Sequence, residues 1–392
     1  MKTLCAARTT RLLVLCARPE PAGEARAEIG RLLSAGPDWE SLLARAEGEG
    51  LLPLLYWSLR ESSAAVPPDV RERLKIHYIK SLARNSQTAK DLEPFLRAVT
   101  DAGLKIVLTK GLRLASTVYP DLGLRPFWDV DFFARPADWP AIRSILEAQG
   151  FEETPESGTA PEAGDAAWAY SPYFRRNGLT VEFHFSLLGL HSPAGPARLE
   201  DMTAAPLAVR GAEVAVLSPE HELCYLCLHA QQHSYQKLIW LADIAGLVSH
   251  PGLDRDKFAG ACASLGIRAP VHHGLRLAER LWPGSVPPEI MPRLRPRRLQ
   301  RAALRFFWPE TTVADREALP AWPYDMPSLF SLWERKSPGA AARVLSGLLF
   351  PPRRWLARTS GVPASSPRLY LQYARRILRP FGLAVRRLVN VR

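Results

Sequence analysis

Apolar residues recur at helical spacing through about the first hundred residues of the chain. After Asp38, a typical N-cap residue, they stand close to 3.6 residues apart. They are Leu42, Leu43, Leu51, Leu52, Leu54 and Leu55. A second helical stretch begins at the prolines 67 and 68 and stops at Gly103. The pattern predicts a helical amino-terminal region over residues 1–90.

The pattern changes after Gly103 to short apolar runs separated by helical segments. The strand-like runs are 104–111, 127–133 and 179–187, and the helical ones are 112–120 and 139–151. A stretch rich in Gly, Pro, Ala and acidic residues at 152–172 predicts a flexible loop between strands. This alternation predicts an α/β (α+β) fold with a small mixed-sheet core over residues 91–217.

From Ser218 the pattern is helical again as far as Val248. It predicts a helical domain over 218–285, packed on the core. After about residue 285 the chain is rich in Pro and Arg with scattered amphipathic segments, which predicts a basic, helical carboxyl-terminal region over 286–392.

The formal net charge of +12 is concentrated in that last region. From Arg293 to Arg392 there are twenty basic residues and five acidic ones. Such a field attracts phosphate-rich partners, either RNA or an anionic membrane surface. Arginines with apolar residues between them are Arg375, Arg376, Arg386 and Arg387. The alternatives are a surface helix that covers the domain and a compositional bias toward Arg, Ala and Pro.

Hydropathy and cysteine content indicate the cellular compartment in which the protein is expected. No apolar run approaches the roughly twenty residues of a membrane span, and the amino-terminal "LLVLCA" is too short for a signal-peptide core. Five cysteines in a long chain favour free thiols over a disulfide framework. The sequence therefore predicts a soluble cytoplasmic protein.

Two aspartates stand one residue apart in the apolar run "FWDVDFF". On a strand, residues i and i+2 project from one face about 6.5–7 Å apart, so Asp129 and Asp131 would point the same way, with Trp128 and Val130 opposite. Two such carboxylates repel each other unless a cation lies between them, and Mg²⁺ or Mn²⁺ suits oxygen ligands. The alternative is a pair of strand-end aspartates that cap turns.

A third carboxylate is available on the strand at 179–187. There Glu182 and His184 share one face, and Val181 and Phe183 share the other. Glu182 could complete a metal site, or it could lie on a solvated face. His184 could bind metal or substrate, or it could be a structural histidine bonded to a neighbour.

The segment "LTKGLRLAS" passes from a strand through a glycine turn into a helix start. Backbone N–H groups and the helix dipole favour phosphate at such a place, and Lys110 adds a positive charge next to Gly111. Lys110 and Arg125 could instead form salt bridges with the aspartates.

The run "CYLCLHAQQH" invites comparison with a zinc site. At about 100° per residue, Cys224 and Cys227 fall on one side of a continuous helix, and His229 and His233 fall on nearly the opposite side. The four side chains therefore cannot ligate one ion. We predict that both cysteines are core residues.

Together these segments resemble the uncharacterised nucleotidyltransferase family of the polymerase-β-like superfamily. The resemblance extends from near Asp38 to Val248. The superfamily pattern is a glycine turn, a later strand with Asp-x-Asp, and a further strand with a third acidic residue. Here the turn departs from the usual Gly-Ser or Gly-Gly, because Lys110 precedes the glycine and Leu112 follows it, so the usual serine contact to the phosphates is missing.

The resemblance implies roles for individual residues. Gly111 would be the phosphate-binding turn, with Lys110 and Arg125 as further nucleotide- or phosphate-binding residues, and Arg125 matches an arginine of the family. The implied metal ligands and catalytic residues are Asp129, Asp131 and Glu182. The segment after Ser218 resembles the family's helix beside the active site, with Lys237, His229, His233 and Asp243 as candidates for accessory or nucleotide contacts.

The implied reaction is metal-dependent transfer of NMP from an NTP, most simply AMP from ATP, onto a hydroxyl of a small molecule, peptide or RNA. The cofactor would be Mg²⁺ or Mn²⁺, with the NTP as co-substrate. Two alternatives stay open. One is a non-catalytic nucleotide- or partner-binding protein on a degenerate fold, and the other is an RNA-modifying, toxin-like protein.

Overall fold

A computed structural model describes residues 2–19, 23–60, 66–154, 171–187, 199–309, 338–351 and 353–390. Within them a seven-stranded mixed sheet runs in the order β3-β4-β5-β2-β1-β7-β6. The strands are β1 (Ile106–Thr109), β2 (Val130–Ala134), β3 (Glu152–Glu153), β4 (Tyr173–Arg176), β5 (Leu179–His184), β6 (Leu207–Val209) and β7 (Ala212–Val216). The α/β prediction is confirmed. Most of the predicted 152–172 loop lies outside the described residues.

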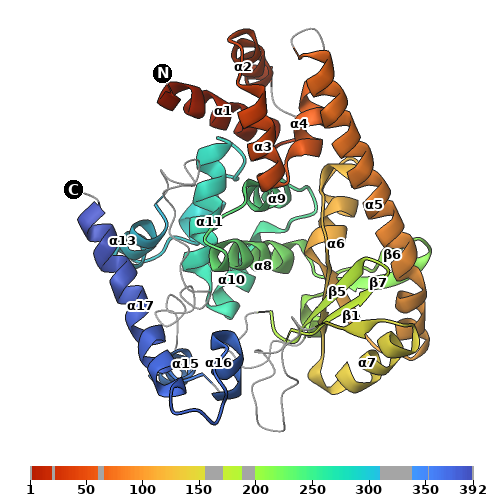
Figure 1. Ribbon diagram of the computed structural model, residues 1–392, viewed down its shortest axis with the longest axis vertical. Coiled ribbons are helices and arrows are strands. Elements are labelled where there is room, and N and C mark those ends of the chain that lie inside the picture. The colour runs from red at the N-terminus through yellow and green to blue at the C-terminus, as the bar shows by residue number, and fades with distance from the viewer. Residues whose placement is uncertain are drawn as a thin grey trace.

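The amino-terminal part is helical, as the periodicity predicts. Its helices are α1 (Lys2–Cys16), α2 (Gly23–Ser34), α3 (Trp39–Glu49), α4 (Leu52–Leu59) and α5 (Pro68–Asp101). Asp38 caps α3 by accepting a hydrogen bond from the backbone N–H of Ser41 at 3.1 Å. The long helix α5 runs from these helices down along the sheet (Figure 1), from the predicted 1–90 region into the predicted core.

Helix α5 also holds the loop that leads into β2. The side-chain amide of Asn85 is buried and donates to the carbonyl oxygens of Leu122 at 2.7 Å and Arg125 at 3.1 Å. A Cβ on Gly123 would lie 2.8 Å from Cβ of Leu82. Because only glycine allows this approach, the loop is fixed against the helix.

The two faces of the sheet differ in character: one packs into an apolar core, and the other carries polar side chains. On one face Val130, Phe132 and Phe183 join a core with Phe95 of α5 and with α7 (Trp139–Ala148). The other face carries the polar side chains of β2 and β5 and looks toward α8 (Pro219–Gln232). The period-2 alternation predicted this division for β2 and β5.

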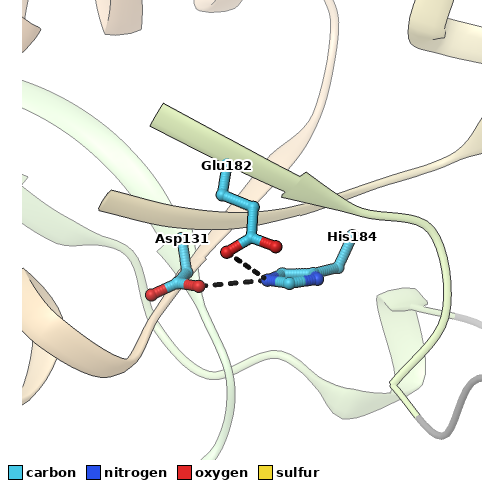
Figure 2. A group of neighbouring side chains, drawn as sticks. All are labelled: Asp131, Glu182 and His184. Carbon is cyan, nitrogen blue, oxygen red and sulfur yellow. Dashed lines mark hydrogen bonds and ion pairs between the residues drawn. The ribbon is translucent and has the colours of Figure 1, made fainter. Parts of the chain in front are cut away.

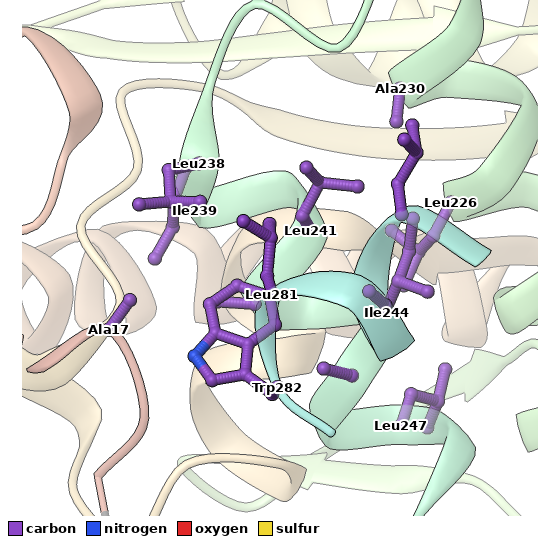
Figure 3. Packing of buried hydrophobic residues seen from close by; sticks show 14 of the residues in the cluster. Ala17, Leu226, Ala230, Leu238, Ile239, Leu241, Ile244, Leu247, Leu281 and Trp282 are labelled. Atoms are coloured by element: carbon purple, nitrogen blue, oxygen red, sulfur yellow. The ribbon is translucent and has the colours of Figure 1, made fainter. Parts of the chain in front are cut away.

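A second, larger core joins the amino-terminal helices to helices that follow the sheet in the chain. Its elements include α8, α9 (Leu238–Val248), α10 (Arg255–Leu265) and α11 (Arg268–Leu281). Figure 3 shows Leu281 and Trp282 packed near Ala17 and the apolar face of α9. The indole N–H of Trp282 donates to the carbonyl oxygen of Val14 at 2.7 Å, which ties α11 to α1.

Further helices belong to the predicted basic region. They are α12 (Ile290–Arg293), α13 (Arg298–Phe307), α15 (Pro338–Leu349), α16 (Arg353–Ser360) and α17 (Leu369–Asn390). Leu304 and Trp308 are buried in the larger core, so the start of the region is part of the folded body. No helix among the described residues has the length and apolar character to cross a membrane.

Candidate active site

Asp131 and Glu182 lie side by side because β2 and β5 are neighbouring parallel strands. Their register pairs Asp131 with Glu182 and Phe133 with His184. Figure 2 shows the two carboxylates and the imidazole of His184 turned toward one another. One ligand atom from each of the three residues lies within 4.8 Å of the others. The predicted convergence of the β2 and β5 acids is therefore present, with an imidazole added.

The imidazole of His184 joins the two carboxylates. Its Nε2 lies 3.0 Å from Oδ1 of Asp131 and 3.6 Å from Oε2 of Glu182, while Nδ1 lies 3.5 Å from Oγ of Ser171. Tyr173, opposite Glu182 on β4, forms a hydrogen bond to that carboxylate. Two carboxylates and one imidazole form a donor set that fits a divalent cation.

Asp129 differs from the prediction, since it is not a strand residue. β2 begins at Val130, and Thr109, the last residue of β1, pairs with Asp131. Asp129 has no strand partner there and lies in a bend, outside the close group of three ligand residues. Burial, and then the negative charge of Asp131, raise the pKa of its carboxyl to about 6. It therefore lies within the electrostatic reach of the group.

Lys110 supplies positive charge to the site. Its Nζ lies 2.6 Å from Oδ1 of Asp131, and both side chains are buried. Burial alone would lower the pKa of Lys110, but Asp131 raises it well above its usual range. Burial would raise the pKa of Asp131, yet Lys110 and His184 hold it well below its usual range. The pair is therefore ionised at neutral pH.

Glu222, a residue that sequence reasoning missed, fixes the turn between β1 and α6 (Lys110–Thr117). Its buried carboxylate accepts hydrogen bonds from the Thr109 hydroxyl at 2.9 Å and from the Lys110 backbone N–H at 2.9 Å. Nε of Arg113 lies 3.7 Å away. Lys110 has a φ of 50°, a left-handed conformation that is uncommon outside glycine, and these bonds hold it there.

This arrangement alters the expected phosphate site at the start of α6. The N–H of Lys110 already donates to a carboxylate, so it is not free for an anion. A Cβ on Gly111 would lie 2.9 Å from Cβ of Phe127 and 3.3 Å from the carbonyl oxygen of Asp129. Glycine is required here for close approach of α6 to the segment before β2.

Arg125 and Asp243 are bonded to each other. Nη2 of Arg125 lies 2.8 Å from Oδ2 of Asp243, and both side chains are buried. The Tyr119 hydroxyl donates to Oδ1 of Asp243 at 2.7 Å. Burial would lower the pKa of Arg125, but Asp243 raises it. Arg125 therefore pairs with Asp243 of α9, and not with Asp129 or Asp131 as the alternative for this residue expected.

We call five rings near the carboxylates the aromatic rim: Tyr225 and His229 of α8, its C-cap residue His233, Trp240 of α9, and Trp128 in the bend before β2. Nζ of Lys110 lies 5.4 Å from the ring centroid of Tyr225, which lies 6.2 Å from that of His229. The two histidine rings are 4.7 Å apart, and each packs on Trp240. Tyr225, Trp128 and Trp240 gave no sequence signal as site residues, because apolar aromatic positions are also typical of a core.

The predicted histidines belong to this rim, and Lys237 lies against two of its indoles. Nζ of Lys237 lies 5.6 Å from the Trp128 ring centroid and 5.8 Å from that of Trp240. Burial, and then the charges of Lys110 and Lys237, lower the pKa of His233 to about 4. Burial and Lys110 likewise hold the pKa of His229 well below its usual range. Both imidazoles are therefore neutral at pH 7.

The cysteines of "CYLC" lie away from this rim, as predicted. Cys224 and Cys227 are buried free thiols in the larger core, and Sγ of Cys224 lies 3.5 Å from Sγ of Cys262. Cys16 is also a buried free thiol. The two histidines are in the rim, so the four residues do not form a zinc site.

A comparison with protein-family models agrees with these features. A family model described as "uncharacterised nucleotidyltransferase" matches residues 35–283. A comparison with curated proteins gave no match. Among solved structures, an antigenic nucleotidyltransferase-like protein from Paracoccidioides brasiliensis is similar, with 15% identity, 53% of this chain and 91% of that chain covered, and a TM-score of 0.35. Because the family model spans more than half of the chain, the chain belongs to the uncharacterised nucleotidyltransferase family.

Proposed function

We propose that the protein transfers a nucleoside monophosphate from an NTP, most simply AMP from ATP, to a hydroxyl group of a small molecule, peptide or RNA. The family supports a role in nucleotidyl transfer and a nucleotide substrate. The main structural support for the proposal is the convergence of Asp131, Glu182 and His184 on one face of two neighbouring strands.

These residues would hold Mg²⁺ or Mn²⁺, with Asp129 as a further ligand beside them. A divalent cation bound there would supply positive charge for the phosphates at the reacting centre. Lys110 holds a permanent positive charge next to Asp131 and can pair with a phosphate oxygen. Glu182, bonded to Tyr173, is the carboxylate placed to accept the proton of the attacking hydroxyl.

The alternative is a protein that binds a nucleotide or partner without turnover. The absence of the superfamily's usual serine in the glycine turn and the engaged amide of Lys110 favour it. The ionised Lys110–Asp131 pair and the nearby Glu182 and His184 favour catalysis, because buried charges are costly to retain without a use for them.

A labelling experiment distinguishes nucleotidyl transfer from binding without turnover. The full chain is incubated with each α-labelled NTP, Mg²⁺ or Mn²⁺ and cell extract, in parallel with the Asp129→Ala/Asp131→Ala double variant. We expect a labelled product with the wild type and a loss of about 1000-fold in the variant, since metal-ion catalysis contributes several kcal/mol and each ~1.4 kcal/mol is tenfold. Equal label in both samples would contradict the proposal, and nucleotide binding without label would support the alternative.

We propose a separate partner for the basic carboxyl-terminal region, either RNA or an anionic membrane. From Arg335 to Arg392 the sequence has thirteen basic residues and no acidic one. In α17, Tyr370, Leu371 and Leu378 are exposed. Exposed apolar residues among arginines suit an anionic surface. A cytoplasmic setting agrees with the buried free thiols.

Charge reversal tests this partner without removing the buried Leu304 and Trp308. We expect Arg368→Glu/Arg375→Glu to weaken binding of the full chain to RNA or to anionic vesicles, with an affinity that falls steeply with salt. Binding to RNA alone or to vesicles alone identifies the partner. If the charge-reversed variant binds RNA and anionic vesicles as tightly as the wild type does, the proposal is contradicted.

A further inference from the structure

The indole of Trp128 is exposed at the bend that leads to Asp129 and β2. Its exposed fraction is 60%, and the next residue is Asp129. A single exposed aromatic residue on a surface is ordinary. Trp128, however, has two cations at its ring: Cζ of Arg84 lies 5.5 Å and Nζ of Lys237 lies 5.6 Å from the ring centroid.

These cations come from two different elements. Arg84 belongs to α5, and Lys237 is the N-cap residue of α9. Lys237 also lies near Trp240, so it stands between two indoles of the aromatic rim. The neutral rings of His229 and His233 continue the rim back toward Lys110 and Asp131. A series of ring and cation contacts therefore connects Trp128 and Lys237 to Lys110 at the carboxylates.

This combination matches a ligand that has an aromatic ring and negative charge in one molecule. We propose that Trp128 stacks on the base of the bound nucleoside triphosphate, with Lys237 and Arg84 beside the nucleotide. The inference rests on the proposed function and assigns the base-binding residue of that same site. Every base has a π-face, so stacking on Trp128 favours all four NTPs over inorganic triphosphate.

Equilibrium binding tests the assignment without turnover. ATP and UTP are titrated in the calorimeter, with Mg²⁺, into the full-length wild type and into Trp128→Ala and Trp128→Phe. Since base stacking on an aromatic side chain is lost in the alanine variant, we expect its Kd for both nucleotides to rise roughly 5- to 150-fold. The phenylalanine variant keeps a ring and should recover most of the affinity.

Phe350 provides a control. Its side chain is aromatic and 62% exposed, close to the 60% of Trp128, and it is not part of the aromatic rim. Phe350→Ala should leave the Kd for ATP unchanged. Inorganic triphosphate, which lacks a base, should bind Trp128→Ala and the wild type equally well.

The outcomes separate this inference from the proposed function. If the wild type binds ATP and Trp128→Ala binds it equally well, base stacking is contradicted while nucleotide binding stands. If Trp128→Ala loses ATP and triphosphate to the same degree, the base is not the group that Trp128 contacts. If the wild type binds no NTP, the proposed function itself fails.

Discussion

Asp131→Asn is expected to weaken Mn²⁺ binding by at least roughly 100-fold. Residues that only orient a metal ligand are worth about 10- to 100-fold in affinity, and Asp131 would be a ligand itself. Its carboxylate stands at the centre of the group, within reach of Glu182, His184 and Lys110. Asparagine keeps the shape of the side chain but removes the charge that attracts a hard cation.

Calorimetric titration of Mn²⁺ into the full chain measures the effect. The matched control is Asp101→Asn, because Asp101 is the exposed last residue of α5, before the opposite end of β1. Its Mn²⁺ affinity should equal that of the wild type. Equal affinities of Asp131→Asn and the wild type would show that the carboxylates serve only to bind Lys110 and His184.

Arg125→Met is expected to lower the free energy of unfolding by about 3–5 kcal/mol. Removing one partner of a buried ion pair leaves the other charge without compensation. Here the remaining charge would be Asp243, which is fully buried in α9 and bonded to Tyr119. The double variant Arg125→Met/Asp243→Asn removes that charge but keeps an acceptor for Tyr119, and should recover at least half of the loss.

Denaturant unfolding measures these differences, with Arg143→Met as the control. Nε of Arg143 lies 2.8 Å from Oε1 of Glu147, the same separation as in the Arg125–Asp243 pair, but both side chains are on the surface. An exposed pair contributes only about 0.3–0.5 kcal/mol. If Arg125→Met unfolds like the wild type but binds NTP weakly, Arg125 acts on the phosphates, as the family resemblance implies.

The sequence was sufficient for the parts of the site that depend on local periodicity. Glu182 and His184 alternate with Val181 and Phe183, and a strand with one apolar face can orient such residues in only one way. Asp129 was misplaced because the end of a strand depends on its partners: β1 stops opposite Asp131. The residues of β2 alone do not show where its partner strand ends.

Contacts between distant segments could not be predicted. Glu222 lies more than a hundred residues after Thr109, and at the start of α8 it looks like an ordinary acidic residue of a first helical turn. Only the packing of α8 against β1 turns its carboxylate toward Lys110. Lys237 and Trp128 likewise meet through tertiary structure alone.

The hydrogen bonds from Asn85 to the loop before β2 limit where the chain can be shortened. Because Asn85 holds the carbonyl oxygens of Leu122 and Arg125, a shortened chain that starts at the sheet would lose the anchor of the segment leading to Asp129. Helix α5 is thus part of the scaffold of the candidate site, and a fragment that preserves this site has to include α5.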